Sequence, residues 1–279
     1  MLLIRTVAEL RAWSREARNS EKSVGLVPTL GALHEGHLSL VRAAKASCGA
    51  VAASIFVNPT QFGPNEDFAK YPRTFDADCA MLEAEDVDVV FAPALEEIYR
   101  PGAATFVEVE GLSDRLDGQS RPGHFRGVAT VVAKLFIAAE PDKAFFGQKD
   151  AAQVAVLRQM VADLALPVEL VVCPIVREPD GLAMSSRNRY LSLEERRRAL
   201  VLSRALGVVQ ELAASGEMRA SRLKEAAWSV FATEPAVQVD YIAAVDWATL
   251  EPVELVGPGS LFAVAAYVGK TRLIDNLVF

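Results

Sequence analysis

PTLGALHEGH, residues 28–37, contains two of the three histidines in this chain of 279 residues. It follows a short apolar run, residues 24–27, and precedes a run with helical spacing, residues 38–46. This order predicts a strand, a glycine-containing turn and a helix. The backbone N–H groups at the start of a helix lack partners within the helix, and nucleotide phosphates commonly bind them. The segment therefore predicts a phosphate-binding turn.

Short apolar runs and helical segments alternate along the first part of the chain. The predicted strands are residues 24–27, 50–57, 87–91, 105–109, 143–146 and 168–172, and the predicted helices are residues 7–17, 38–46, 75–85, 128–139 and 151–164. Continuous apolar runs of this length are typical of parallel strands that are buried on both faces. The alternation predicts a Rossmann-like α/β fold, a doubly wound parallel sheet with its ligand site at the carboxyl ends of the strands.

The pattern changes after Val176. The elements predicted there are helices at residues 192–214 and 221–232 and antiparallel strands at residues 237–245 and 260–268. Ser192 and Glu195 have the spacing of a capping box, which predicts the start of the first of these helices. We therefore predict two domains, a nucleotide- and substrate-binding domain at residues 1–176 and a smaller α+β lid domain at residues 177–279.

Composition excludes several classes of protein. With 51% hydrophobic and 23% charged residues the chain is globular, and its net charge of −7 argues against nucleic-acid binding, which needs a basic face. Cys48, Cys79 and Cys173 form no CxxC pair, so neither a disulfide framework nor a zinc cluster is predicted. Charges interrupt the N-terminal segment, and no later run reaches the roughly 18 apolar residues of a membrane span. We therefore expect a cytoplasmic protein without membrane contact.

Three segments carry the residue types of a nucleotide site. His34 and His37 are three positions apart with Gly36 between them, which does not match the four-residue spacing of helical zinc ligands. Hydrogen-bonding imidazoles at a helix start stabilise negative charge on phosphate. Lys149, in the turn of residues 147–150, is a compact cation suited to phosphate. Residues 184–187 add two hydroxyls and a guanidinium.

These segments resemble a known family. The HxGH pattern of residues 34–37 and the MSSR pattern of residues 184–187 are similar to the paired signatures of nucleotidyltransferases that adenylate carboxylates and phosphates. More closely, the segments PTLGALHEGH, IFVNPTQFGPNEDF, YPRT, RPGHFRGVATVV, FFGQKD and DGLAMSSRNRYLS resemble those of the pantoate–β-alanine ligase family. The resemblance covers residues 24–195, and residues 271–276 resemble that family's ending.

The resemblance implies a reaction in two steps. A pantoate carboxylate attacks the α-phosphorus of ATP to give pantoyl adenylate and pyrophosphate, and the amine of β-alanine then attacks the acyl carbon and releases AMP. ATP is thus a substrate, and Mg²⁺ is expected with it, bound mostly by phosphate and water. The small domain would act as a lid. A homodimer is expected on the resemblance alone.

The resemblance also assigns roles to individual residues. The catalytic residues would be His34, His37, Lys149 and Arg187, with His37 as the proton donor. The ATP-binding residues would be Leu30, Gly31, Ala32, Leu33, His34, Glu35, Gly36, His37, Gly147, Gln148, Lys149, Asp150, Val176, Met184, Ser185, Ser186 and Arg187. Asn58, Gln61 and Gln153 would bind pantoate or β-alanine, and Asp78 is the nearest match to a carboxylate that binds Mg²⁺ in the family.

Some features leave alternatives open. Leu30 stands where the family usually has methionine, and Ala151 and Ala152 stand where an aromatic residue and a glutamine are common. The loop with Arg121, His124 and Arg126 has three possible roles: to contact substrate, to order the cleft, or to pack at a subunit contact. An adenylyltransferase that makes a dinucleotide and a catalytically silent nucleotide-binding protein are the competing functions, and Gln61 and Gln153 discriminate against the first.

Overall fold

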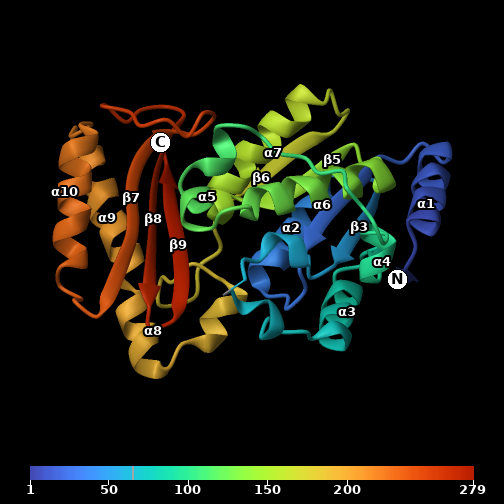
Figure 1. Ribbon diagram of the computed structural model, residues 1–279, viewed down its shortest axis with the longest axis horizontal. Helices are drawn as coiled ribbons and strands as arrows, with labels where there is room; N and C mark the ends of the chain where they lie inside the picture. The colour runs from blue at the N-terminus through green and yellow to red at the C-terminus, as the bar shows by residue number, and fades with distance from the viewer. Residues whose placement is uncertain (65) are drawn as a thin grey trace. The chain divides into compact units, whose positions relative to one another are not determined.

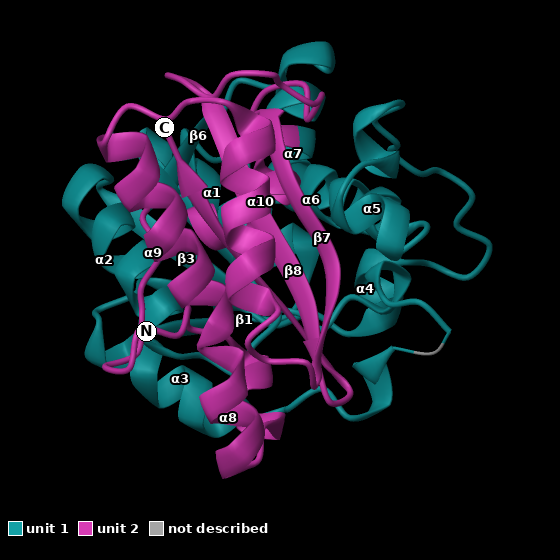
Figure 2. Cartoon of the chain, turned by 90° about the vertical axis from the view of Figure 1, so that its left-hand side faces the viewer, with its two compact units in different colours: residues 1–147, 156–173 teal, residues 148–155, 174–279 magenta. Residues whose placement is uncertain are grey.

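The computed structural model (Figure 1) describes residues 1–64 and 66–279. These residues divide into two compact units. Unit 1 comprises Met1–Gly147 and Val156–Cys173, and unit 2 comprises Gln148–Ala155 and Pro174–Phe279 (Figure 2). Asn65, in the quoted segment IFVNPTQFGPNEDF, lies outside the described residues. The assignment of residues 1–176 and 177–279 as functional domains, with the second as a lid, stays a prediction.

Unit 1 is built on a parallel sheet with the strand order β1-β4-β3-β2-β5-β6. The strands are β1 (Leu2–Ile4), β2 (Val24–Thr29), β3 (Ala50–Ile55), β4 (Val89–Phe91), β5 (Lys143–Gly147) and β6 (Glu169–Cys173). The chain runs from β2 outward through β3 to β4 and then returns to the other side of β2 with β5. This reversal is a topological switch point, where α/β sheets bind ligands at the carboxyl ends of their strands.

Helices cover both faces of this sheet (Figure 1). They are α1 (Val7–Asn19), α2 (Glu35–Ser47), α3 (Phe75–Ala84), α4 (Leu95–Ile98), α5 (Asp117–Ser120), α6 (His124–Ala139) and α7 (Ala151–Asp163). Val27 packs with α2 and α3, whereas Val24 packs with α1. Side chains an odd number of positions apart point to opposite faces of a strand. The fold predicted from the alternating pattern, a Rossmann-like doubly wound sheet, is thereby confirmed.

Unit 2 contains an antiparallel sheet with the order β7-β8-β9. Its strands are β7 (Val237–Asp246), β8 (Ser260–Val268) and β9 (Thr271–Val278), and its helices are α8 (Leu193–Ala199), α9 (Val201–Ala214) and α10 (Ala220–Phe231). A core that includes Leu202, Leu223 and Phe262 joins α9 and α10 to the sheet. The predicted antiparallel pairing of the strands near residues 237–245 and 260–268 is confirmed.

The structure corrects two predicted elements and adds two strands. Residues 105–109 are not a strand, because the backbone N–H of Val107 donates to the Thr130 hydroxyl on α6 (2.9 Å) rather than to a neighbouring strand. The helix predicted at residues 192–214 is two helices, α8 and α9, which break at Leu200, although the Ser192–Glu195 capping box is present. Strands β1 and β9 were not predicted.

In the part of the chain that the structure describes, no helix combines the length and the apolarity needed to cross a bilayer.

Candidate active site

The turn after β2 is held by a buried carboxylate. Gly31 and Ala32 both have positive φ, +79° and +51°, and this backbone brings two successive N–H groups to Asp78. Asp78 is only 1% exposed and accepts hydrogen bonds from Ala32 N (2.9 Å), Leu33 N (2.8 Å) and the Thr74 hydroxyl (3.0 Å). A Cβ on Gly31 would lie 3.0 Å from Asp78 Oδ2, so glycine also gives the carboxylate room.

These contacts bear on the predicted Mg²⁺ site. Both oxygens of Asp78 already accept hydrogen bonds from unit 1 itself. Among the described residues, no group of three or more His, Cys, Asp or Glu side chains is arranged to hold a metal ion. These contacts favour a role for Asp78 in holding the turn over the predicted role as a Mg²⁺ ligand.

The two histidines cap helix α2 in a reciprocal way. His34 is the N-cap residue, and its Nδ1 accepts a hydrogen bond from Gly36 N (3.2 Å). His37 Nδ1 accepts from His34 N (3.3 Å), and the two ring centroids are 4.1 Å apart. A ring nitrogen that accepts a hydrogen bond carries no proton, so each neutral ring has its proton on Nε2. Both imidazoles are thus fixed as Nε2–H donors.

A network around Asn58 orients the amide of Gln61. Asn58 is fully buried, and its Nδ2 donates to Gln61 Oε1 and to the Gly127 carbonyl, each at 3.1 Å. Its Oδ1 accepts from the Tyr99 hydroxyl (3.0 Å), and burial raises the pKa of Tyr99. Because Oε1 of Gln61 faces Asn58, the NH₂ group of that amide is the side presented to a ligand.

Arg121 and His124 hold the backbone of the same glutamine. His124 Nδ1 donates to the Gln61 carbonyl (2.8 Å), and His124 Nε2 accepts from Arg121 Nη1 (3.0 Å). Arg121 also binds Glu66 through Nε (2.7 Å) and Nη2 (2.6 Å). Burial, together with the positive charge of Arg121, lowers the pKa of His124 to about 4. His124 is therefore neutral, with the proton on Nδ1.

Of the three roles left open for this loop, the contacts support the ordering of Gln61. Arg126 does not join them: it is exposed, and its guanidinium lies over the ring of Phe106, 3.9 Å from the centroid.

Unit 2 contains the turn of Gln148–Asp150, which follows β5. The Lys149 side chain is 20% exposed, and its closest carboxylate among the described residues is Asp150, at 3.9 Å from Nζ. This distance is long for an ion pair, so Asp150 neutralises the ammonium only weakly, and the Lys149 side chain as a whole is largely buried. Gln153 is half-buried on the first turn of α7.

The second segment of unit 2 is a hairpin that leads into a short 3-10 helix, Ser186–Tyr190. Val176 and Met184 pair through a backbone hydrogen bond (2.9 Å), and the Ser185 hydroxyl caps the short helix by accepting from Arg187 N (3.3 Å). The side chain of Asn188 donates to Glu178 Oε1 (2.7 Å), which closes the hairpin.

Each unit thus contains its own share of the predicted residues. In unit 1 these are the turn and helix start of residues 30–37, Asn58 with Gln61, and Asp78 beneath the turn. In unit 2 they are Gln148–Asp150, Gln153, Val176 and residues 184–187. No role was predicted for Glu66, Tyr99 or Asn276, whose partners are distant in sequence. Glu66 lies in the segment IFVNPTQFGPNEDF and Asn276 in the one that resembles the family's ending, but neither was assigned a role there.

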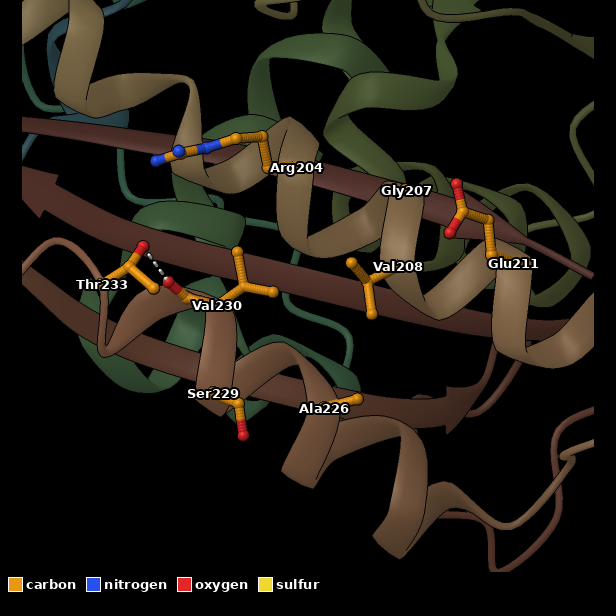
Figure 3. Close-up of a pocket in the computed structure, with 8 residues that line it drawn as sticks. All are labelled: Arg204, Gly207, Val208, Glu211, Ala226, Ser229, Val230 and Thr233. Carbon is orange, nitrogen blue, oxygen red and sulfur yellow. Dashed lines mark hydrogen bonds between the residues drawn. The ribbon is translucent and has the colours of Figure 1, made fainter.

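A groove between α9 and α10 is separate from these residues (Figure 3). It measures about 670 Å³, and none of the predicted site residues lines it. Its walls include Gly207, Val208 and Val230, with Arg204 and Glu211 at the edge.

Comparisons with known proteins cover the whole chain. The family model for pantoate-beta-alanine ligase matches residues 2–278. Pantothenate synthetase of Acidobacterium capsulatum is 66% identical, over 98% of this chain and 95% of that protein, and the enzyme of Koribacter versatilis is 59% identical, over 100% and 96%.

Solved structures agree with this assignment. Pantothenate synthetase from Thermus thermophilus has a TM-score of 0.94 at 47% identity, covering 100% of this chain and 99% of that one. Pantoate-beta-alanine ligase from Francisella tularensis, described in complex with beta-gamma ATP and beta-alanine, has a TM-score of 0.79 at 33% identity, covering 100% and 97%. The resemblance found in the sequence motifs is confirmed: this chain belongs to the pantoate–β-alanine ligase family of enzymes.

Proposed function

We propose that this protein condenses (R)-pantoate with β-alanine to form pantothenate, through a pantoyl-adenylate intermediate, with release of AMP and pyrophosphate. Membership of the family supports this reaction, and so does the named complex of the Francisella tularensis relative with a form of ATP and β-alanine. The observation that carries the proposal is the reciprocal capping of α2, because it fixes two neutral Nε2–H donors side by side at a helix start.

In the first step, a carboxylate oxygen of pantoate attacks the α-phosphorus of ATP and pyrophosphate leaves. Negative charge grows on the phosphate oxygens as the bond to pyrophosphate breaks, so donors already oriented toward them lower the barrier. We assign this role to His34, His37, Lys149 and Arg187, with His37 as the proton donor. The weakly neutralised ammonium of Lys149 supports its part in this assignment.

We propose that the ATP-binding residues are those at 30–37 and 147–150, together with Val176 and residues 184–187. ATP enters as its Mg²⁺ complex, a substrate in which phosphate and water supply the metal ligands. Asp78 acts on the turn that it holds, since both of its oxygens are engaged there.

In the second step, the amine of β-alanine attacks the acyl carbon of the adenylate and AMP leaves. Gln61 and Gln153 are assigned to pantoate and β-alanine. The NH₂ group that Gln61 presents is a donor, which suits the hydroxyl and carboxylate oxygens of pantoate. We also propose a cytoplasmic location, as expected from the sequence itself, and a homodimer, as expected on the family resemblance alone.

The direct test is to incubate the purified protein with ATP, pantoate and β-alanine and to follow AMP and pantothenate. We expect multiple turnovers only when all three substrates are present, and one equivalent of pyrophosphate per site when β-alanine is omitted. Multiple-turnover AMP release without β-alanine, activity without pantoate, or a dinucleotide product would each contradict the proposal. The last of these would identify an adenylyltransferase instead.

A further inference from the structure

Strand β9 binds the Gln148–Asp150 turn through a single side chain. Asn276 is 4% exposed, and its Nδ2 donates to the carbonyls of Gln148 and Lys149, both at 3.0 Å. The Gln148 side chain returns the contact, with its Nε2 donating to Asn276 Oδ1 (3.1 Å). Three hydrogen bonds therefore connect one buried amide to two successive residues of the turn.

The preceding residue of β9 binds the hairpin that leads to residues 184–187. Asp275 is 2% exposed and accepts hydrogen bonds from Arg177 Nη1 (2.7 Å) and Nη2 (3.0 Å). Arg177 Nη1 also donates to the Gly181 carbonyl (3.0 Å) at the hairpin's tip. A bidentate arginine–carboxylate pair fixes orientation as well as distance.

The two side chains reach different segments because neighbouring side chains on a strand point to opposite sides. Asp275 Oδ1 also accepts from Asn276 N (2.8 Å), so the carboxylate and the amide are held relative to each other. β9 is itself paired with β8 along its whole length, from Leu261–Val278 to Val268–Thr271. Both segments are thus held by side chains of the same strand, β9.

We propose that Asp275 and Asn276 are positioning residues for adenylation: Asn276 sets the Lys149 ammonium through the backbone of its turn, and Asp275 sets residues 184–187 through Arg177. This inference rests on the proposed function, in which Lys149 and Arg187 bind the phosphates of ATP. Neither Asp275 nor Asn276 touches the nucleotide in this account. Their effect is on the geometry of groups that do, and displacement by about 1 Å in such groups costs on the order of a hundredfold in rate.

A double-mutant cycle tests the part of Asn276. We expect Asn276→Ala to lower kcat/KM for ATP by about ten- to a hundredfold. In a Lys149→Ala background the same change should cost less than about twofold, because the group it positions is absent. Asn276→Ser, whose shorter side chain cannot reach both carbonyls, should give a loss in the same direction, and it serves in place of Asn276→Ala if that variant does not fold.

Asp240→Asn is the matched control. It removes the ion pair between Asp240 and Arg272, another β9 residue, with distances of 2.9 and 2.7 Å. We expect a lower unfolding midpoint and unchanged kcat/KM for ATP. The parallel cycle with Asp275→Asn and Arg187→Ala tests the second half of the proposal in the same way.

The possible outcomes distinguish a failure of this inference from a failure of the proposed function on which it rests. If Lys149→Ala lowers activity but the loss caused by Asn276→Ala is the same in both backgrounds, the positioning role is overturned and the proposed function stands. If Asn276→Ala lowers the unfolding midpoint without changing kcat/KM, the residue is only structural. If Lys149→Ala has normal activity, both the role of Lys149 and the inference built on it fail.

Discussion

At His37 the two ring nitrogens have separate roles. Nδ1 accepts a hydrogen bond from the backbone N–H of His34 (3.3 Å), and Nε2 therefore carries the ring proton. His34 follows the same rule with Gly36 N (3.2 Å). A histidine in this arrangement stabilises the helix start with Nδ1 and offers a neutral donor with Nε2. The effect on stability and the effect on the reaction can therefore be tested separately, by replacements that imitate one nitrogen at a time.

Asparagine places its side-chain oxygen near Nδ1, and glutamine places its amide nitrogen near Nε2. We expect His37→Asn to keep the cap and the unfolding midpoint but to lose at least about a hundredfold in the adenylation rate. His37→Gln should keep more of the rate and lose about 1 kcal/mol of stability, the usual value of a helix cap. Pyrophosphate release and thermal unfolding measure the two effects. Equal rates for the two variants would remove Nε2 of His37 from the chemistry.

A substitution at Asp78 distinguishes a residue that holds a turn from a residue that binds a metal ion. An Asp78→Asn change keeps the shape but replaces one acceptor oxygen by an NH₂ group, which would face Ala32 N or Leu33 N. We expect a loss of about 1–3 kcal/mol in the free energy of unfolding, the cost of an unsatisfied buried donor. The Mg²⁺ concentration at half-maximal rate should not change. A rise of tenfold or more in that concentration would instead support Asp78 as a metal ligand.

For individual residues of the candidate site, the sequence identified the residue types but not their hydrogen-bond partners. The HxGH pattern predicted both histidines at a helix start, because the glycine, the apolar run before it and the helical run after it are local signals. Asp78 lies 45 positions from Leu33, and Asn276 lies 127 positions from Lys149. A carboxylate or amide that holds a turn from such a distance has no local pattern of its own.

Among the elements, the approach of α6 to the turn of Pro59–Gln61 depends on one glycine. A Cβ on Gly127 would lie 2.4 Å from the Thr60 carbonyl oxygen and 2.6 Å from Gln61 N. The helix therefore comes close enough for the Gly127 carbonyl to accept from Asn58 (3.1 Å) only because no side chain stands between them. The position of Gln61 is set by this helix as much as by its own turn.

We expect Gly127→Ala to move the turn away from α6, to raise KM for pantoate by about tenfold or more, and to destabilise the protein by about 1–3 kcal/mol. Gly207→Ala, in the interior of α9, is the matched control, since a Cβ there meets nothing within 4 Å. That change should leave KM unaltered and raise stability by up to about 1 kcal/mol through helix propensity. Steady-state kinetics and urea unfolding of both variants test the pair, and a normal KM in Gly127→Ala would contradict this account.

Among the helices and strands, some were predicted well by their sequence patterns and others were not. Runs such as residues 50–57, which contain the observed strand Ala50–Ile55, predicted strands well, because a parallel strand buried on both faces must be apolar throughout. In β9 the buried polar residues Asp275 and Asn276 break that pattern, and the strand was missed. The break at Leu200 involves neither glycine nor proline, so the sequence showed one helix where there are two.

For the whole molecule, the stability of the fold at acidic pH depends on His124, which holds the backbone of Gln61. His124 is held neutral between the Arg121 guanidinium and the Gln61 carbonyl, with Glu66 and Asp117 as the nearby carboxylates. Burial and then Arg121 lower its pKa from 6.5 to about 4. Burial alone would raise the pKa of Glu66, but its hydrogen bonds with Arg121 bring it below the ordinary 4.5. Glu66 therefore stays charged over the range in which unfolded histidine titrates.

Between pH 6.5 and about 4, the unfolded chain binds a proton at residue 124 that the folded chain does not. The free energy of unfolding must therefore fall as the pH is lowered through this window, by about 2 kcal/mol at pH 5 from this group. His124→Asn keeps a donor for the Gln61 carbonyl and does not titrate, so its unfolding midpoint should be lower than that of the native protein at pH 7.5 and should decline less toward pH 5. Circular dichroism melts at half-unit steps of pH measure the difference between the two curves. Parallel curves would show that His124 is not the acid-sensitive contact, and that the backbone of Gln61 does not depend on its neutral ring.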